Sequence, residues 1–301
     1  MPVLACYPSA KSVEAVLVLI FVWAMLMVGS KFWSISSDSI GTSGTLNQQQ
    51  LPPDPSLVSS PPRYAFAIIL TGESDTEWDV ESPYFMVARL LTFQLLHSPA
   101  TRSTHDLPLL VLVMENIPEE QRALLTKEDT VVIPVNNITR EWVLAKLNIW
   151  KMTAYDKIAF LDADSILFKQ IDGIFTEPNL PPTREPGKDF YIRDNYMNAG
   201  FFVLAQSETM FNYYLALLNQ PSAFNLSYPK QNLLKYAHRI DSRMPWRDIG
   251  HHWNQKGTSR TEYQGGLKSV HQKWWVSMGD NILDKYVAKV LAEMKAFDGL
   301  A

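Results

Sequence analysis

Apolar and polar residues follow two different patterns on either side of residue 63. After that point, short apolar runs alternate with longer segments in which apolar residues recur every three or four positions. Runs of the first kind predict strands, and segments of the second kind predict helices. We expect strands at residues 64–70, 107–114, 130–135, 157–161 and 201–204, and helices at 83–97, 118–125 and 142–152. The alternation is typical of an α/β domain with a mostly parallel central sheet flanked by helices.

One apolar run stands apart from this domain, near the beginning of the chain. Residues 15–29 carry no charge, and with the flanking residues of 13–33 they approach the roughly 20 residues that span a bilayer as a helix. Residues 34–62 are rich in Ser, Gln, Pro and Thr, a composition typical of a flexible linker. We therefore predict a tail at 1–12, a transmembrane signal anchor at 13–33, a stem at 34–62 and a globular domain at 63–301. A cleaved signal peptide is the alternative for the apolar run.

Composition and charge narrow the classes of partner. The chain has 301 residues, of which 47% are hydrophobic and 19% charged, enough to build a sizeable core. A formal net charge of -4 provides no chain-wide basic field, which argues against nucleic acid as a main partner. The single cysteine, Cys6, cannot form an internal disulfide or a metal site made of several cysteines. An anionic ligand must therefore be held by local groups.

Two aspartates with one alanine between them, Asp162 and Asp164, directly follow the predicted strand at 157–161. In open α/β sheets, ligands bind beyond the carboxyl ends of the strands. Two carboxylates held close together repel each other unless a positive charge lies between them, and Mg²⁺ or Mn²⁺ is usually bound by one or two carboxylates plus phosphate oxygens. The pair is thus a candidate site for a divalent metal, with an ordinary solvated turn as the alternative.

The residues around this pair resemble a known family. Residues 146–175, which read KLNIWKMTAYDKIAFLDADSILFKQIDGIF, are similar to the centre of the glycogenin-like glycosyltransferases, family 8. Residues 196–204 (YMNAGFFVL) and 270–275 (VHQKWW) are similar to two further segments of that family. The resemblance covers residues 63–276 and is nearest to fungal members described as N-acetylglucosaminyl or glucosyl transferases.

This resemblance implies a GT-A type nucleotide-sugar-binding fold and a retaining transfer of a hexose or N-acetylhexosamine from a UDP-sugar to a glycan or glycoprotein. It implies Mn²⁺, or alternatively Mg²⁺, bound by Asp162, Asp164 and His271. Lys273 is implied to contact the diphosphate as a point charge, and Lys146 to approach the donor from the helix before the metal strand. The full set implied to contact the donor is Leu70, Thr71, Lys146, Asp162, Ala163, Asp164, Asn198, Ala199, Gly200, His271 and Lys273.

The chain departs from the family where a catalytic acid is expected. Lys230 stands at the acidic position of the family's Asp-Gln-Gly-Leu-Leu run, so this segment offers only the amide of Gln231. A retaining transfer by double displacement needs a nucleophile on the far face of the sugar, for which Asp194 and Asp241 are candidates. Alternatively, the departing diphosphate itself deprotonates the acceptor. The predicted catalytic residues are Gln231, Asp194 and Lys273.

Two other functions agree with parts of the sequence. A strand followed by Asp162 and Asp164 is also similar to haloacid-dehalogenase-like phosphatases, in which the first aspartate is the nucleophile. Lys230 is compatible with a glycosyltransferase fold that only binds its ligand.

The location of the protein follows from its N-terminal segments. An anchor, a stem and the acceptor sequons at Asn137 and Asn225 predict a single-pass type II protein of the Golgi or another secretory-pathway membrane, with its globular domain in the lumen. The anchor would then be the part of the chain that contacts the membrane.

Overall fold

The computed structural model describes residues 61–71, 82–136, 142–176, 199–220, 224, 229–242, 244–246, 249–257, 259–275 and 281–299. The chain divides into two compact units, Met1–Ser59 and Ser60–Ala301, and every described residue belongs to the second. The predicted tail and anchor, and the predicted stem up to residue 60, lie outside the described residues. Within the described part, no helix is long and apolar enough to cross a bilayer.

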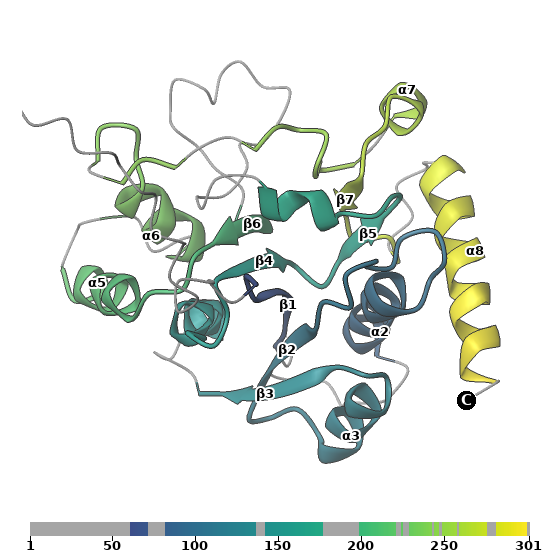
Figure 1. The fold of residues 1–301 in the computed structure, drawn as a ribbon, viewed down its shortest axis with the longest axis horizontal. Helices are drawn as coiled ribbons and strands as arrows, with labels where there is room; N and C mark the ends of the chain where they lie inside the picture. Colours follow the sequence, from purple (N-terminus) through teal and green to yellow (C-terminus); the bar gives the residue numbers. More distant parts are fainter. Residues whose placement is uncertain are drawn as a thin grey trace, which may run out of the picture. The chain divides into compact units, whose positions relative to one another are not determined.

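A five-stranded sheet forms the centre of the second unit, with strands in the order β3-β2-β1-β4-β6 (Figure 1). The strands are β1 (Tyr64–Leu70), β2 (Leu109–Met114), β3 (Val131–Val135), β4 (Lys157–Leu161) and β6 (Phe201–Leu204). Strands β1 to β4 run parallel, and β6 runs antiparallel to β4. Every residue of β2 and all but the first of β4 are buried, as expected for parallel strands covered on both faces.

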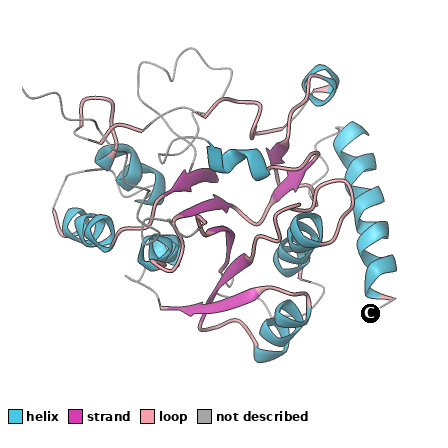
Figure 2. Ribbon diagram, in the orientation of Figure 1, coloured by secondary structure: helices cyan, strands magenta, loops and turns pink. Residues whose placement is uncertain are grey.

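Helices cover both faces of this sheet (Figures 1 and 2). On one side, α5 (Glu208–Leu218) and α6 (Pro229–Ala237) pack with the 3-10 helix η2 (Trp142–Lys151), and on the other α2 (Pro83–Leu96) packs with α8 (Asn281–Asp298). The other described helices are α3 (Glu119–Lys127), the 3-10 helix η3 (Asp172–Thr176) and α7 (Arg260–Gln264). This is the layered α/β architecture that the alternating pattern predicts.

A second sheet, of two short strands, brings the late part of the chain to the end of β4. β5 (Ser165–Leu167) pairs antiparallel with β7 (Ser269–His271), and Ser165 lies directly opposite His271. Ile166 and Val270 join side chains of α2 and α8 in a small core of their own, distinct from the main core around the five-stranded sheet. The packing of this small core therefore fixes where His271 lies.

The strands expected from the apolar runs are confirmed, with bounds that differ by at most two residues. The segment at 142–152 is helical as predicted, but it winds as a 3-10 helix. Five side chains between Ala145 and Trp150 are buried, so tertiary packing rather than one apolar face decides its local geometry. β5 and β7 have three residues each, which is too short for an apolar period to show.

Candidate metal centre

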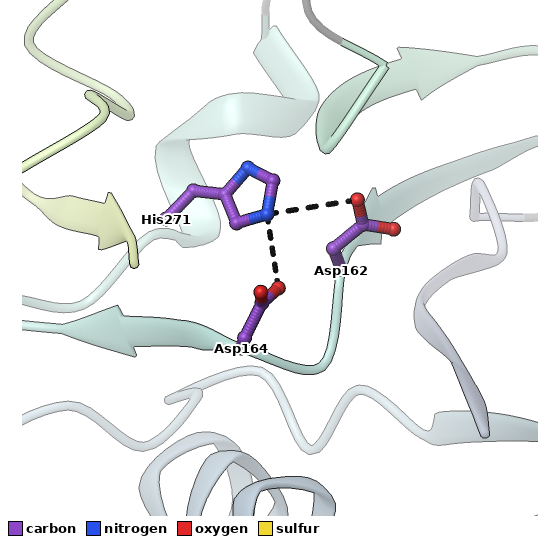
Figure 3. Close-up of side chains that lie close together, drawn as sticks. All are labelled: Asp162, Asp164 and His271. Atoms are coloured by element: carbon purple, nitrogen blue, oxygen red, sulfur yellow. Dashed lines mark ion pairs between the residues drawn. The ribbon is translucent and has the colours of Figure 1, made fainter. Parts of the chain in front are cut away.

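Asp162 and Asp164 lie on a tight turn directly after β4, at the carboxyl edge of the five-stranded sheet. The backbone N–H of Ser165 donates to the carbonyl of Asp162 (3.0 Å) and closes the turn, and the N–H of Asp162 donates to the carbonyl of Gly200 (2.7 Å). Ala163, between the two aspartates, packs against the main core. Figure 3 shows that the turn directs both carboxylates toward one imidazole.

That imidazole belongs to His271, the last residue of β7. Its Nε2 lies 2.9 Å from Oδ1 of Asp164 and 3.8 Å from Oδ2 of Asp162 (Figure 3). One ligand atom from each of the three side chains lies within 4.8 Å of the others. In the part of the chain that the structure describes, this is the only group of His, Cys, Asp or Glu side chains close enough to hold a metal ion.

The chemistry of these donors suits the metal that the family resemblance implies. Carboxylate oxygens are preferred ligands of Mg²⁺ and Mn²⁺, and an imidazole nitrogen is a common ligand of divalent transition metals. The side chains of Asp162, Asp164 and His271 are 15%, 19% and 21% exposed, so a ligand from solvent can reach a cation held between them. The residues present therefore fit a divalent cation shared with a bound ligand.

The two carboxylates beside His271 also favour its protonated form. Burial lowers the pKa of His271, but the hydrogen bond to Asp164 and the negative charges of Asp162 and Asp164 outweigh it, so the pKa is raised above its ordinary value. A proton on the imidazole thus partly compensates the two carboxylates in the place where a cation fits.

Lys146, on η2, supplies a fixed positive charge beside this group. Its Nζ donates to Oδ1 of Asp162 (2.8 Å) and to the carbonyl of Ala199 (2.9 Å), and it lies 4.5 Å from the centroid of the Phe160 ring. The side chain is only 3% exposed. The family resemblance predicts a lysine near the donor, and the structure adds direct contacts to the metal motif and to residue 199.

Lys273 lies two residues after His271 and is exposed. Its Nζ is 3.3 Å from the hydroxyl of Tyr84, in the first turn of α2, and 6.0 Å from the centroid of the Trp275 ring. The rings of Tyr84 and Trp275 meet edge to face at 5.3 Å. Sequence reasoning missed Tyr84, although an aromatic residue at the start of the helix after β1 is a usable signal, because ligands bind at that edge of the sheet.

Four other residues that are predicted to contact the donor lie beside the metal motif. Leu70 and Thr71 are at the carboxyl end of β1, the neighbour of β4, and the side chain of Leu70 is buried, so the predicted contact of Leu70 with the donor would be made by its backbone. Ala199 and Gly200 directly precede β6, and their carbonyls accept the hydrogen bonds from Lys146 and Asp162 described above.

The structure describes only some of the residues that are predicted to take part in catalysis. Asp194 and Asn198 lie outside the described residues. Gln231 lies in α6 and is partly buried, and its catalytic role stays a prediction. Asp241, the other candidate nucleophile, is exposed and pairs with Arg239 (Nε to Oδ1, 2.9 Å). The geometry therefore brings the three predicted metal ligands together and leaves the catalytic assignments as predictions.

Comparisons with known proteins indicate the class of enzyme. No family model matches the chain. The chain is 25% identical over 286 residues to an uncharacterised protein of Schizosaccharomyces pombe, a match that covers 73% of this chain and 75% of that protein. It is 27% identical over 163 residues to UDP-glucuronate:xylan alpha-glucuronosyltransferase 1 of Arabidopsis thaliana, a match that covers 50% of this chain and 23% of that protein. The chain is a glycosyltransferase similar to family 8.

A solved structure supports the fold of this glycosyltransferase. The glycosyltransferase GlyE of Streptococcus pneumoniae TIGR4 superposes with a TM-score of 0.53 at 14% identity, over 79% of this chain and 64% of that one. The α/β, GT-A-like architecture with a mostly parallel sheet is thereby confirmed. The phosphatase alternative is set aside because the Arabidopsis relative is named as a glycosyltransferase and because β1, β2 and β3 all precede Asp162, whereas those phosphatases open their domain on the nucleophile strand.

Proposed function

We propose that this glycosyltransferase is a metal-dependent, retaining enzyme that moves a hexose or an N-acetylhexosamine from a UDP-sugar to a glycan or glycoprotein acceptor. The observation that carries the proposal is the convergence of Asp162, Asp164 and His271 at the carboxyl edge of the sheet. The printed name of the Arabidopsis relative, a UDP-glucuronate:xylan alpha-glucuronosyltransferase, supports a UDP-sugar as the class of donor.

The three side chains would hold Mn²⁺ or Mg²⁺, which neutralises the charge that develops on the departing diphosphate. The two oxygens of Asp162 have different surroundings, because Oδ1 accepts a hydrogen bond from Lys146 and Oδ2 faces His271. Oδ2 of Asp162, Oδ1 of Asp164 and Nε2 of His271 face one another and would be the atoms that hold a cation.

Lys273 is the residue that stabilises the departing diphosphate in this proposal. Its ammonium is exposed, and its hydrogen bond to the Tyr84 hydroxyl is long at 3.3 Å, so it can turn toward an anion without losing a strong contact. A positive charge aimed at the leaving group lowers the barrier of the transfer. Gln231 and Asp194 stay the predicted groups on the far face of the sugar, with deprotonation of the acceptor by the diphosphate as the alternative.

The proposal extends to where the protein is found. The apolar run at 13–33 and the polar segment at 34–62 support a single-pass type II protein of the Golgi or another secretory-pathway membrane. The sequons at Asn137 and Asn225 agree with a luminal domain. This orientation is tested by producing the protein in a eukaryotic host and treating it with a glycosidase that removes N-linked glycans. We expect the protein to lose mass, and a cytosolic, unmodified protein would contradict the proposal.

UDP release by the full chain tests the activity. We expect release from at least one member of a panel of UDP-sugars in the presence of Mn²⁺, loss of release when the metal is chelated, and recovery when Mn²⁺ is added back. Hydrolysis of phosphate monoesters, with no UDP release from any donor, would overturn the proposal. Tight binding of a UDP-sugar without release, with or without sugar acceptors, would favour the second candidate, a fold that only binds its ligand.

A further inference from the structure

Asp164 and His271 are brought together by a sheet of only two short strands. β5 and β7 have three residues each, and Ser165 lies directly opposite His271. An isolated pair of strands is marginally stable at best in water. A slip of one residue between the two strands would turn the side chains of one strand to the other face and separate Asp164 from His271. The geometry of the candidate metal centre therefore depends on what fixes β5 in place.

The side chain of Gln94, on α2, binds both backbone groups of Leu167, the last residue of β5. Nε2 of Gln94 donates to the carbonyl of Leu167 (2.7 Å), and Oε1 accepts from the N–H of Leu167 (3.0 Å). Gln94 is fully buried, and α2 packs beside β5 (Figure 1). A carboxamide can make this pair of bonds because it carries a donor and an acceptor side by side. Gln94 thus takes the place of a further strand beside β5.

These hydrogen bonds add a directional constraint to the apolar packing of β5. Leu167 belongs to the main core and its neighbour Ile166 to the small core shared with α2 and α8. Apolar contacts are not directional, whereas a hydrogen bond weakens steeply when its geometry changes. The hydroxyl of Tyr286, on α8, donates to the same carbonyl of Leu167 (2.7 Å). Leu167 is therefore the point at which two helices fix the position of β5 along its own direction.

The constraint reaches the predicted metal ligands through the pairing of β5 with β7. Asp164 lies three residues before Leu167, and its carbonyl accepts from the N–H of Gln272 (3.1 Å). His271, the neighbour of Gln272, lies opposite Ser165, and its Nε2 is 2.9 Å from Oδ1 of Asp164. A displacement of β5 at Leu167 would therefore change the position of Asp164 relative to the imidazole.

We propose that Gln94 is a positioning residue of the candidate metal centre. By binding both backbone groups of Leu167, it holds β5 in the register that brings Asp164 to His271. The inference rests on the proposed function and deepens it, because it names a residue of α2 on which the geometry of the metal ligands depends.

Two substitutions separate this role from a general contribution to stability. Gln94→Met keeps an unbranched side chain of similar length and removes both hydrogen bonds to Leu167. Tyr214→Phe is the control, because it removes another buried hydrogen bond, from the hydroxyl of Tyr214 to Nε2 of His238. Tyr214 lies on α5, which covers the other face of the five-stranded sheet from α2 (Figure 1).

Two measurements on the full chain test the proposal. Mn²⁺ binding in the presence of UDP is measured by calorimetry, at a temperature at which circular dichroism shows each variant to be folded. Amide hydrogen exchange of β5 and β7 is measured without metal. We expect Gln94→Met to bind Mn²⁺ about tenfold more weakly, the lower end of the range for groups that orient metal ligands, and to exchange the amides of β5 and β7 faster. Tyr214→Phe should match the wild type in both, although it unfolds at a lower temperature.

Three results would overturn this inference. The first is wild-type Mn²⁺ affinity in a folded Gln94→Met, since Gln94 would then serve stability alone. The second is equal weakening of Mn²⁺ binding in Tyr214→Phe. The third is rapid exchange of the Leu167 amide in the wild type, which is decisive even if Gln94→Met does not fold. Absence of any Mn²⁺ binding to the wild type with UDP would instead overturn the proposed function, and hydrogen exchange would still decide whether Gln94 fixes β5.

Discussion

Two partly buried clusters of charge in the described part of the chain each contain two carboxylates and one fixed cation, but they share this cation differently. Between α2, α3 and α8, Arg89 pairs with Glu128 (2.5 Å) and with Asp298 (2.8 Å). In the metal centre, Lys146 pairs with Asp162 and gives a second hydrogen bond to a backbone carbonyl, while Asp164 pairs with His271. In the first cluster one guanidinium pairs with both carboxylates. In the second, the ammonium pairs with Asp162, and Asp164 pairs with a histidine.

The difference follows from the two cationic side chains. A guanidinium carries five N–H donors in a rigid fork and can bond two carboxylates at once, whereas an ammonium acts as a compact point charge. Arg89 lies where three helices must be joined, and the stacked rings of His97 and Phe297, 4.5 Å apart, reinforce the same junction. Buried charge by itself therefore does not identify a functional site in this protein. Asp164, whose charged partner among the described residues is a histidine that can lose its proton, marks the candidate site instead.

The largest effect is expected from matched amide substitutions in the two clusters. Asp164→Asn should lower metal-dependent UDP release by about a hundredfold or more, the scale of losing one electrostatic stabiliser of a transition state, because it removes a charged metal ligand. Asp298→Asn, the same change in the other cluster, should leave the rate of UDP release unchanged. Initial rates at saturating Mn²⁺ check both. Equal loss of activity in the two variants would mean that the clusters do not differ in function.

Removing the charge of Arg89, which pairs with Glu128 and Asp298, should have the next largest effect, a loss of stability. Arg89→Met leaves the buried carboxylate of Glu128 without its partner, and we expect the free energy of unfolding to fall by about 3 kcal/mol. Lys289→Met is the control, since Lys289 forms an exposed pair with Glu293 (3.5 Å) and its loss should change stability by less than about 0.5 kcal/mol. Denaturant unfolding measures both, and similar values for the two variants would contradict the proposed role of Arg89.

The three side chains that could hold a metal ion could be found from the sequence because each lies in a segment with its own signature. Asp162 and Asp164 follow a strand of five residues that is apolar apart from its first lysine, and His271 lies in a short motif with Lys273 and Trp275. The strand β2 has six buried residues in a row, so it appears in the sequence as an apolar run. Such a run predicts a strand without knowledge of the strands that it pairs with.

The pairings between distant residues could not be predicted in the same way. The ion pair of Arg89 with Asp298 joins two helices through packing that no local period encodes. The contact of Lys146 with Asp162 likewise depends on how η2 packs beside β4. From the sequence, Lys146 is predicted to contact the donor, but not Asp162. Which charges pair with one another is a property of the assembled core, so the sequence indicates the residues of the candidate site more readily than their ion pairs.

The smallest expected effect is a pH dependence of stability that arises from Glu128. Burial raises the pKa of Glu128, and the hydrogen bond and charge of Arg89 offset only part of this; Oε2 is buried with no hydrogen-bond partner among the described residues. A carboxyl with a raised pKa in the folded state contributes stability that is fully present below its ordinary pKa of 4.5 and is lost as the pH rises through the folded value.

Urea unfolding of the wild type and of Glu128→Gln, from about pH 4 to about pH 7, measures this contribution. The glutamine keeps the shape of the side chain but does not titrate, so the difference in unfolding free energy isolates Glu128. We expect the wild type to lose stability relative to the variant as the pH rises, by about 1.4 kcal/mol for each unit by which the pKa is raised. A difference that does not change with pH would mean that Arg89 compensates the burial of Glu128 completely, in spite of the unpartnered Oε2.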